Sequence, residues 1–149
     1  MKEKPIIHEI KGKVTVKYRW SYGKHLSKFF IAMRDEKKLI GARCKNCKSV
    51  LYPYIHVCGR CFCETEDEPV VLSQTGTLVS WTTVYLSFPG QPKQPPYTYG
   101  LIRIDGADNA YHGIIDAPEE QLKPGLKLKV RWKQKRLGYP LDIDAWVPR

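Results

Sequence analysis

Two cysteine pairs, Cys44-Lys-Asn-Cys47 and Cys58-Gly-Arg-Cys61, decide how the middle of this chain folds, and ten residues separate them. Each Cys-x-x-Cys pair bends the backbone so that two sulfur atoms converge on one ion, and two pairs supply a closed tetrahedral site. A closed site leaves no position for water or substrate, so the predicted metal is structural, and zinc is favoured. Iron also suits four sulfur ligands and stays open as the alternative.

Two neighbouring side chains could compete for the metal. Cys63 lies two residues beyond the last predicted ligand and is expected to be a free thiol, while His56 is expected to lie at the surface or in packing. Five cysteines, an odd number, fit a reducing compartment better than a disulfide framework. The start has no signal-peptide pattern, and no apolar run approaches the roughly 20 residues of a membrane helix. We therefore expect a cytoplasmic protein with no membrane association.

Before the cysteines, the spacing of Leu26, Phe29, Phe30 and Met33 predicts a helix over residues 25–37 with one apolar face. This face must pack either on the chain's own core or on a partner subunit. Residues 1–20 are interpreted as an extended arm. Residues 1–39 together form a basic N-terminal arm and docking helix.

After the cysteines, several segments have strand character, and the most regular alternates apolar and basic residues from Leu126 to Lys133. The proline-rich stretch 87–96 is expected to be an irregular loop. Five or six strands in about 80 residues fit a small closed barrel of the OB type, although alternation alone leaves a sandwich open. The expected strands cover residues 70–72, 76–85, 97–104, 111–115, 126–135 and 143–147.

These patterns predict a mainly β protein with an N-terminal helix. A zinc ribbon is expected over residues 40–66 and an OB-fold over residues 67–149. The segment Glu64-Thr-Glu-Asp-Glu-Pro69 is interpreted as a polar link that buries nothing, which places a boundary near residue 66.

The net charge of +10 is unevenly distributed. Residues 1–48 hold fourteen basic and four acidic residues, a surplus of ten, and residues 127–136 hold six basic residues and no acid. Two basic regions favour an anionic partner. An OB barrel with aromatic side chains also fits single-stranded nucleic acid, which is the alternative function. The aromatic candidates for base stacking are Trp81, Tyr85, Tyr97 and Tyr99.

No group of residues indicates catalysis by this chain alone. Its four histidines are scattered, and neither a Gly-x-Ser-x-Gly motif nor a glycine-rich phosphate loop is present. His112 follows a turn-like segment, where its side chain could reach a barrel mouth.

Several further stretches resemble the rubredoxin-like zinc-ribbon plus OB-fold family of acyl-CoA-associated accessory proteins. The likeness covers roughly residues 22–148, with one departure, because Pro53 stands alone before Tyr54 where many relatives have two prolines. The stretches are Lys38-Leu-Ile-Gly-Ala-Arg-Cys44, Tyr52-Pro53, Gly76-Thr-Leu-Val-Ser-Trp-Thr-Thr-Val84, Pro95-Pro-Tyr97 and Leu101-Ile-Arg-Ile-Asp-Gly106.

This resemblance implies a non-catalytic subunit in a hetero-oligomer with a thiolase-like or other acyltransferase catalytic subunit, assisting assembly and the binding of CoA or acyl-CoA. The stretch Tyr18-Arg-Trp-Ser-Tyr-Gly23 resembles members paired with thiolase-type subunits in anaerobic aromatic degradation. The catalytic residues would then belong to the partner. Basic side chains can hold the phosphates of CoA, and the candidates here are Lys93, Lys133 and Lys135.

Overall fold

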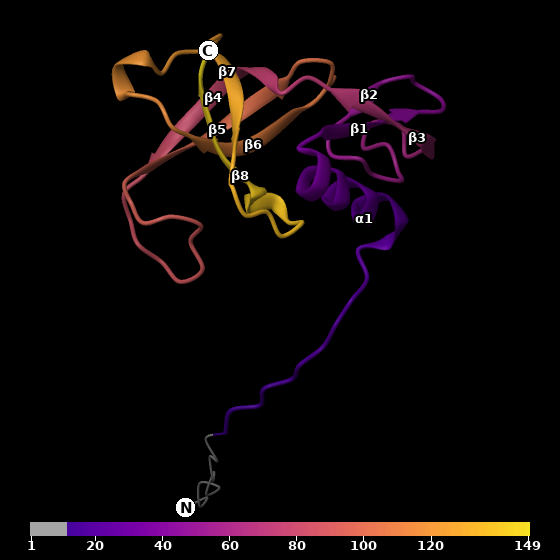
Figure 1. Ribbon diagram of the computed structural model, residues 1–149, viewed down its shortest axis with the longest axis horizontal. Helices are drawn as coiled ribbons and strands as arrows, with labels where there is room; N and C mark the ends of the chain where they lie inside the picture. The colour runs from indigo at the N-terminus through magenta and orange to yellow at the C-terminus, as the bar shows by residue number, and fades with distance from the viewer. Residues whose placement is uncertain (1–11) are drawn as a thin grey trace, which may run out of the picture.

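The computed structural model describes residues 12–149 and combines one helix, a three-stranded sheet and a closed five-stranded barrel (Figure 1). The helical region is α1 (Gly23–Ile31) continued by the π-helical turn η1 (Ala32–Glu36). The strands are β1 (Leu39–Cys44), β2 (Val50–Leu51), β3 (Thr65–Leu72), β4 (Thr75–Val84), β5 (Tyr97–Ile104), β6 (Ala110–Ile115), β7 (Lys127–Trp132) and β8 (Ile143–Pro148). Two 3-10 turns, η2 (Glu119–Gln121) and η3 (Pro140–Asp142), precede β7 and β8.

The N-terminal arm leaves the folded part of the molecule. Residues 12–22 have no regular secondary structure, every one of them is exposed, and the chain extends away from the helix (Figure 1). The predicted arm is therefore seen over residues 12–20. Its first part, residues 1–11, lies outside the described residues.

The helix predicted over residues 25–37 is present, but it begins at Gly23 and its last turn is π-helical. Lys37 ends the helical region with a left-handed backbone, at φ 53°. The side chains of Phe29 and Met33 are 4% and 1% exposed, because they pack into the chain's own hydrophobic core. Of the two alternatives left by the sequence, the apolar face thus packs within this chain.

The three-stranded sheet has the order β2-β1-β3, with both pairs antiparallel. The prediction of a polar link over residues 64–69 is wrong, because β3 begins at Thr65 and pairs with β1 along its length. Thr65 is buried, and its hydroxyl donates a 2.6 Å hydrogen bond to the carbonyl oxygen of Ile55. The segment 70–72 is the end of β3 and belongs to this sheet, so the sheet continues across residue 66 to Leu72.

The barrel has the strand order β4-β5-β6-β8-β7, and β4 closes it by pairing with both β5 and β7. Only the β6–β8 pair is parallel. This closed arrangement is the OB type predicted from the strand pattern, and it excludes the sandwich. A bulge between Leu78 and Ser80 shifts the register of the long strand β4 against β5.

One hydrophobic core joins the helix, the ribbon and the barrel. It includes Phe29 and Met33 from the helical region, Tyr52 from the ribbon, and Ile102 and Trp146 from the barrel. The buried side chains of this core come from parts of the chain that would otherwise be separate modules. The three parts therefore fold as one packed unit.

The turn before β6 fastens the ribbon to the barrel with hydrogen bonds. The Asp108 carboxylate accepts a 2.7 Å bond from the Val50 backbone N–H, and the Asp108 N–H donates to the Val50 carbonyl at 2.8 Å. The Asn109 side chain accepts from the Tyr52 N–H at 2.8 Å and donates to the Tyr52 carbonyl at 2.7 Å. Asp108 and Asn109, hereafter the clamp, thus bond the backbone of Val50 in β2 and of Tyr52 directly after it.

Candidate metal centre and the cavity beside the barrel

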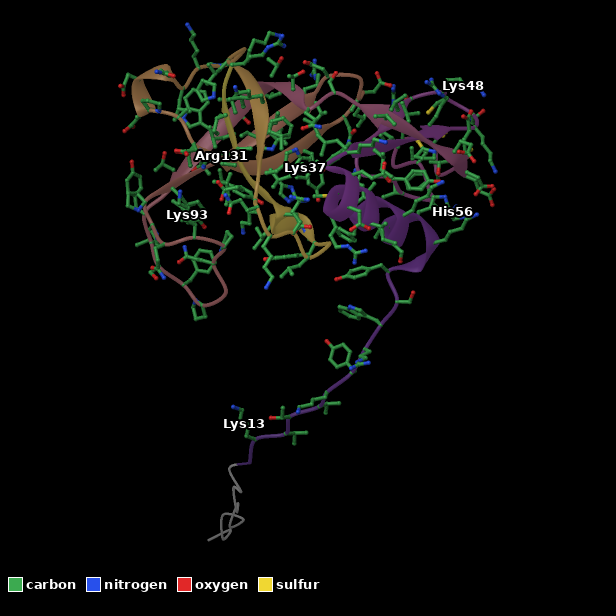
Figure 2. All side chains as sticks on the ribbon, in the orientation of Figure 1. Lys13, Lys37, Lys48, His56, Lys93 and Arg131 are labelled. Atoms are coloured by element: carbon green, nitrogen blue, oxygen red, sulfur yellow. The ribbon has the colours of Figure 1, made fainter. Side chains whose placement is uncertain are left out.

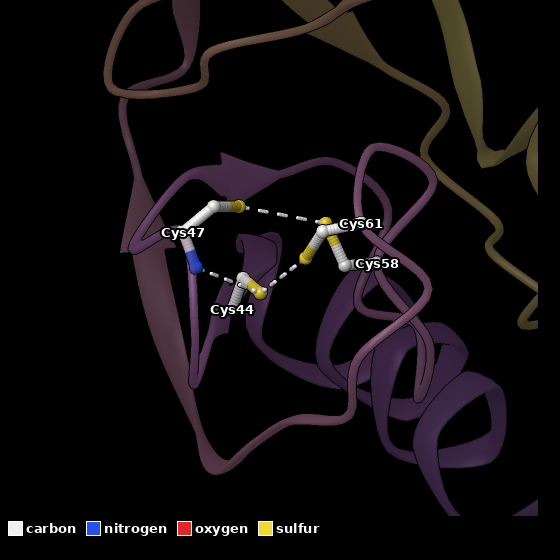
Figure 3. A group of neighbouring side chains, drawn as sticks. All are labelled: Cys44, Cys47, Cys58 and Cys61. Atoms are coloured by element: carbon white, nitrogen blue, oxygen red, sulfur yellow. Dashed lines mark hydrogen bonds between the residues drawn. The ribbon is translucent and has the colours of Figure 1, made fainter.

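The four predicted cysteines lie together at one end of the ribbon (Figure 3). The sulfur atoms of Cys44 and Cys61 are 3.4 Å apart, those of Cys47 and Cys58 are 3.7 Å apart, and all four lie within 4.8 Å of one another. Metal–sulfur bonds of about 2.3 Å set the sulfurs of a tetrahedral site about 3.8 Å apart. The spacing fits one ion with four thiolate ligands.

Both cysteine pairs use the same local backbone conformation. Cys44 and Cys47 are followed by Lys48 with φ 60°, and the second pair is followed by Phe62 with φ 58°. A left-handed residue directly after each pair reverses the chain, so that the two sulfurs of the pair face inward. The equal spacing in the sequence therefore produces two matching loops around one centre.

Backbone N–H groups point at the sulfur atoms. The amides of Asn46 and Cys47 each lie 3.4 Å from the Cys44 sulfur, and the amide of Arg60 lies 3.4 Å from the Cys58 sulfur. Such donors stabilise the negative charge of a thiolate. These loops are thus built to hold charged sulfur ligands.

The proton affinities of the thiols differ with their surroundings. Burial raises the pKa of Cys44 to about 11, whereas a hydrogen bond from the Cys63 backbone is the main cause that lowers the pKa of Cys61 to about 6. The pKa of Cys47 is lowered, first by a hydrogen bond with the Ser49 side chain. Metal binding requires thiolates, so the ion must displace the proton of Cys44 in particular.

Cys63 and His56 stay outside the cluster. The Cys63 thiol donates a 3.5 Å bond to the carbonyl oxygen of Cys61, and its sulfur is not among the four that converge. The His56 side chain is exposed, with its Nε2 4.0 Å from a carboxylate oxygen of Glu64. The four cysteines can therefore hold a metal ion such as zinc without a fifth ligand from these residues.

A second feature, a cavity of about 330 Å³, lies where the helix, the ribbon and the barrel meet. Its walls are mainly apolar and aromatic. The helical region contributes Leu26, Phe29, Phe30 and Met33, the ribbon contributes Tyr52, Pro53 and Ile55, and the barrel with its last loop contributes Tyr99, Ile104, Tyr111, His112, Gly113, Ile114, Pro140, Leu141, Ile143 and Trp146.

His112 lies on β6, is exposed and lines this cavity, while its predicted position near a barrel mouth stays a prediction. Its ring stacks on the ring of Tyr111, with centroids 4.4 Å apart, and lies 5.5 Å from the ring of Tyr99. No acidic group lines the cavity among the described residues, so His112 has no carboxylate there to orient it as a general base.

The three lysines suggested as phosphate contacts do not line this cavity. Lys93 is exposed on the loop between β4 and β5, as Figure 2 shows. Lys133 and Lys135 follow β7, and the Lys133 backbone N–H donates to the carbonyl of Asp142. Their role in binding phosphate stays a prediction.

The four aromatic residues suggested for base stacking separate into two groups. Trp81 and Tyr85 are 36% and 68% exposed, whereas Tyr97 is buried and Tyr99 lines the cavity. Only the first two present a ring on the surface. Tyr97 belongs to the interior, where it has no free face for a base.

Asp142, which fixes the loop beside the cavity, was not identified from the sequence. Asp142 is fully buried, and its carboxylate accepts hydrogen bonds from the backbone N–H groups of Leu137, Gly138 and Tyr139 at 2.8, 2.7 and 3.3 Å. It fixes the loop that brings Leu141 to the cavity. The sequence signal for it is the turn-forming stretch Gly138-Tyr-Pro-Leu-Asp142, since an aspartate in such a turn commonly bonds nearby amides.

Comparison with known proteins agrees with this architecture. Residues 69–133 match the family described as the ChsH2 C-terminal OB-fold domain. This segment is similar in sequence to that domain. A curated relative from Methanocaldococcus jannaschii, described as a DUF35 domain-containing scaffold protein, is 29% identical over 102 residues, which are 68% of this chain and 72% of the relative.

Two solved structures share the fold. One is the Ltp2-ChsH2(DUF35) aldolase, with a TM-score of 0.61 and 18% identity over 87% of this chain and 98% of that chain. The other is a DUF35 protein of unknown function from Sulfolobus solfataricus, with a TM-score of 0.59 and 21% identity over 82% of this chain and 83% of that chain. These similarities confirm the resemblance to the zinc-ribbon plus OB-fold family. Within residues 12–149, no helix has the length and apolar content to span a bilayer.

Proposed function

We propose that this chain is an accessory subunit of an acyl-CoA enzyme complex and that its four cysteines hold one structural zinc ion. The similarity to a scaffold protein and to a subunit of an aldolase complex supports an assembly role. Zinc would supply no chemistry beyond holding Cys44, Cys47, Cys58 and Cys61 together, because four thiolates leave no open ligand position.

The exposed arm is the observation that most favours docking onto another subunit. Val14, Val16, Tyr18 and Trp20 are 69–89% exposed, although such side chains are usually covered in a finished assembly. The residues that alternate with them are basic or polar: Lys13, Thr15, Lys17 and Arg19. An extended segment of this kind has one apolar and one basic side, and a partner with an apolar groove bordered by acids would complement both.

A second exposed apolar group lies on the loop after β4. Tyr85, Leu86 and Phe88 are 68%, 80% and 55% exposed. Lys93 lies on the same loop, between β4 and β5. Apolar residues that would be buried against a partner subunit thus lie on the same loop as Lys93, whose charge could bind an anionic ligand.

In the more specific form of the proposal, the partner is a thiolase-type subunit, the setting is anaerobic aromatic degradation in the cytoplasm, and the ligand is CoA or acyl-CoA. The catalytic groups would lie in that partner. Lys93, Lys133 and Lys135 are the proposed contacts to CoA phosphates, since a lysine ammonium attracts phosphate as a point charge.

The test is purification of the tagged chain from its native cells, followed by mass spectrometry, metal analysis and an assay of thiolytic cleavage of β-ketoacyl-CoA. We expect a thiolase-type subunit in fixed stoichiometry, one zinc per chain, and activity only when both subunits are present. Trp20→Glu should lower recovery of the partner at least tenfold, while the exposed change Lys123→Gln, which lies outside the arm, should keep it within twofold. Recovery without any acyl-CoA enzyme would refute the proposal.

The second candidate is a module that binds single-stranded nucleic acid. The exposed rings of Trp81 and Tyr85 on a strongly basic chain favour it. Binding to oligonucleotides that weakens steeply with salt, together with co-purifying nucleic acid and no enzyme subunit, would support this alternative.

A further inference from the structure

The cavity at the junction of helix, ribbon and barrel has the features of a ligand site. Its volume of about 330 Å³ lies at the lower end of the range for small-molecule sites. We infer that it binds a small, uncharged, planar aromatic molecule that carries one carbonyl acceptor.

Part of the cavity wall consists of aromatic rings that contact one another, beside the aliphatic side chains that also line it. The ring of Tyr52 meets Phe29 edge to face at 5.3 Å and 71°, and meets Tyr111 at 5.0 Å and 83°. Edge-to-face and offset contacts are the arrangements that aromatic rings prefer. A planar aromatic guest can continue this pattern, whereas an aliphatic guest of equal size gains only contact area.

The space depends on Gly113 of β6. A Cβ atom at this position would lie 2.8 Å from atoms of the Trp146 indole ring, so any other residue would displace that ring. Glycine therefore lets Trp146 lie directly against β6 as one wall of the cavity.

The charge of the lining selects an uncharged guest. Among the described residues that line the cavity there is no Lys, Arg, Asp or Glu. A charged ligand would lose its hydration without gaining an opposite charge, which is strongly unfavourable in apolar surroundings. The phosphate groups of a nucleotide are excluded for the same reason.

Hydroxyl groups in the lining favour an acceptor on the guest. Tyr52 is 3% exposed, and neither it nor Tyr111 forms a side-chain hydrogen bond with any residue in the described part of the chain. Burial raises the pKa of both phenols, so both hydroxyls keep their protons and act as donors. Both tyrosines line the cavity, and a carbonyl oxygen on the guest would give an O–H there a hydrogen-bond partner.

The test uses the full-length, metal-loaded chain without any partner and three probes of matched size. Acetophenone has the ring and the carbonyl, ethylbenzene lacks the carbonyl, and cyclohexyl methyl ketone lacks the aromatic ring. We expect saturable NMR shifts at the Gly113 amide and the Trp146 indole, with acetophenone binding about three- to tenfold more tightly than either control, as expected for one net neutral hydrogen bond or one aromatic contact.

Two variants locate the site. Tyr52→Phe keeps the ring and should remove the advantage of acetophenone over ethylbenzene, while the same change at the buried Tyr97, which does not line the cavity, should leave it intact. Leu26→Trp should fill the cavity and abolish binding of all three probes.

Three results would overturn the inference: no saturable binding of acetophenone to the unaltered chain, equal binding of the cyclohexyl ketone, or undiminished binding in Leu26→Trp. Occupation by a side chain of a protein partner would appear as the first of these. Since no partner is present in the experiment, its failure would leave the proposed accessory role standing, and failure of that role would leave the cavity result unchanged.

Discussion

Replacing Asn109 by alanine should weaken the attachment of the ribbon to the barrel while leaving both sheets formed. The Asn109 side chain makes the two hydrogen bonds to the Tyr52 backbone, at 2.8 and 2.7 Å. Tyr52 is 3% exposed, so water cannot easily replace the lost partner. Two buried backbone groups without partners cost about 1–3 kcal/mol each.

We therefore expect Asn109→Ala to lower the free energy of unfolding by about 2–6 kcal/mol. Urea unfolding of the metal-loaded chain, followed by circular dichroism and fitted with a common slope, measures this change. Asn109→Asp keeps the acceptor for the Tyr52 N–H but loses the donor to the Tyr52 carbonyl. If the bond from the Tyr52 N–H contributes most of the stability, Asn109→Asp should lower the free energy of unfolding less than Asn109→Ala does.

The matched surface change is Gln94→Ala, on an exposed side chain of the proline-rich loop. It should shift the free energy of unfolding by no more than about 0.5 kcal/mol. If Asn109→Ala falls within the same limit, the clamp does not fasten the ribbon, and the reasoning from its hydrogen bonds is refuted.

Three further outcomes follow from the same geometry. Cys58→Ser should lose the metal and the circular dichroism signal of the ribbon, because metal binding supplies the free energy that folds the ribbon. Cys63→Ser should keep one ion per chain. An unchanged spectrum in Cys58→Ser would contradict this. Asp142→Ala should cost about 2–4 kcal/mol in urea unfolding, because three backbone N–H groups lose their acceptor, and a cost near zero would show that water replaces the carboxylate. Burial lowers the pKa of His25 below 6.5 in the folded state, so the unfolded state binds the proton more readily and stability falls as the pH drops below about 6.5. Between about pH 7 and pH 5 the free energy of unfolding should therefore fall more for the unaltered chain than for His25→Phe. An equal fall in both would refute this.

The sequence was most informative where chemistry imposes a strict spacing. Two Cys-x-x-Cys pairs predicted the cluster, because few backbone paths bring four sulfurs together. Steps of three and four residues predicted the helix, and alternation around Leu128 predicted β7 with its basic outer side. Each of these patterns is local, so it can be read without knowing the rest of the fold.

The polar segment 64–69 was misread because β3 is an edge strand. In the order β2-β1-β3 it pairs on one side only, so its other side tolerates acids and even Pro69, which lacks an N–H. Composition alone made it resemble a link. The pairing with β1 that makes it a strand is a tertiary contact.

The cavity could not be predicted for a related reason. Its walls come from residues as distant as Leu26, Tyr52, Tyr111 and Trp146, each of which reads in isolation as an ordinary core residue. Only the assembled fold shows that these side chains border a space instead of filling it.

The position of β8 at the end of the fold has a consequence for synthesis on the ribosome. The three strands of the ribbon and its four cysteines are all present once residue 72 has emerged, before any strand of the barrel. The barrel closes only when β8 (Ile143–Pro148) joins β6 and β7, and Trp146 arrives with it. Until then Phe29 and Met33 lack part of their cover, so this order of synthesis leaves apolar side chains exposed until the last strand has emerged.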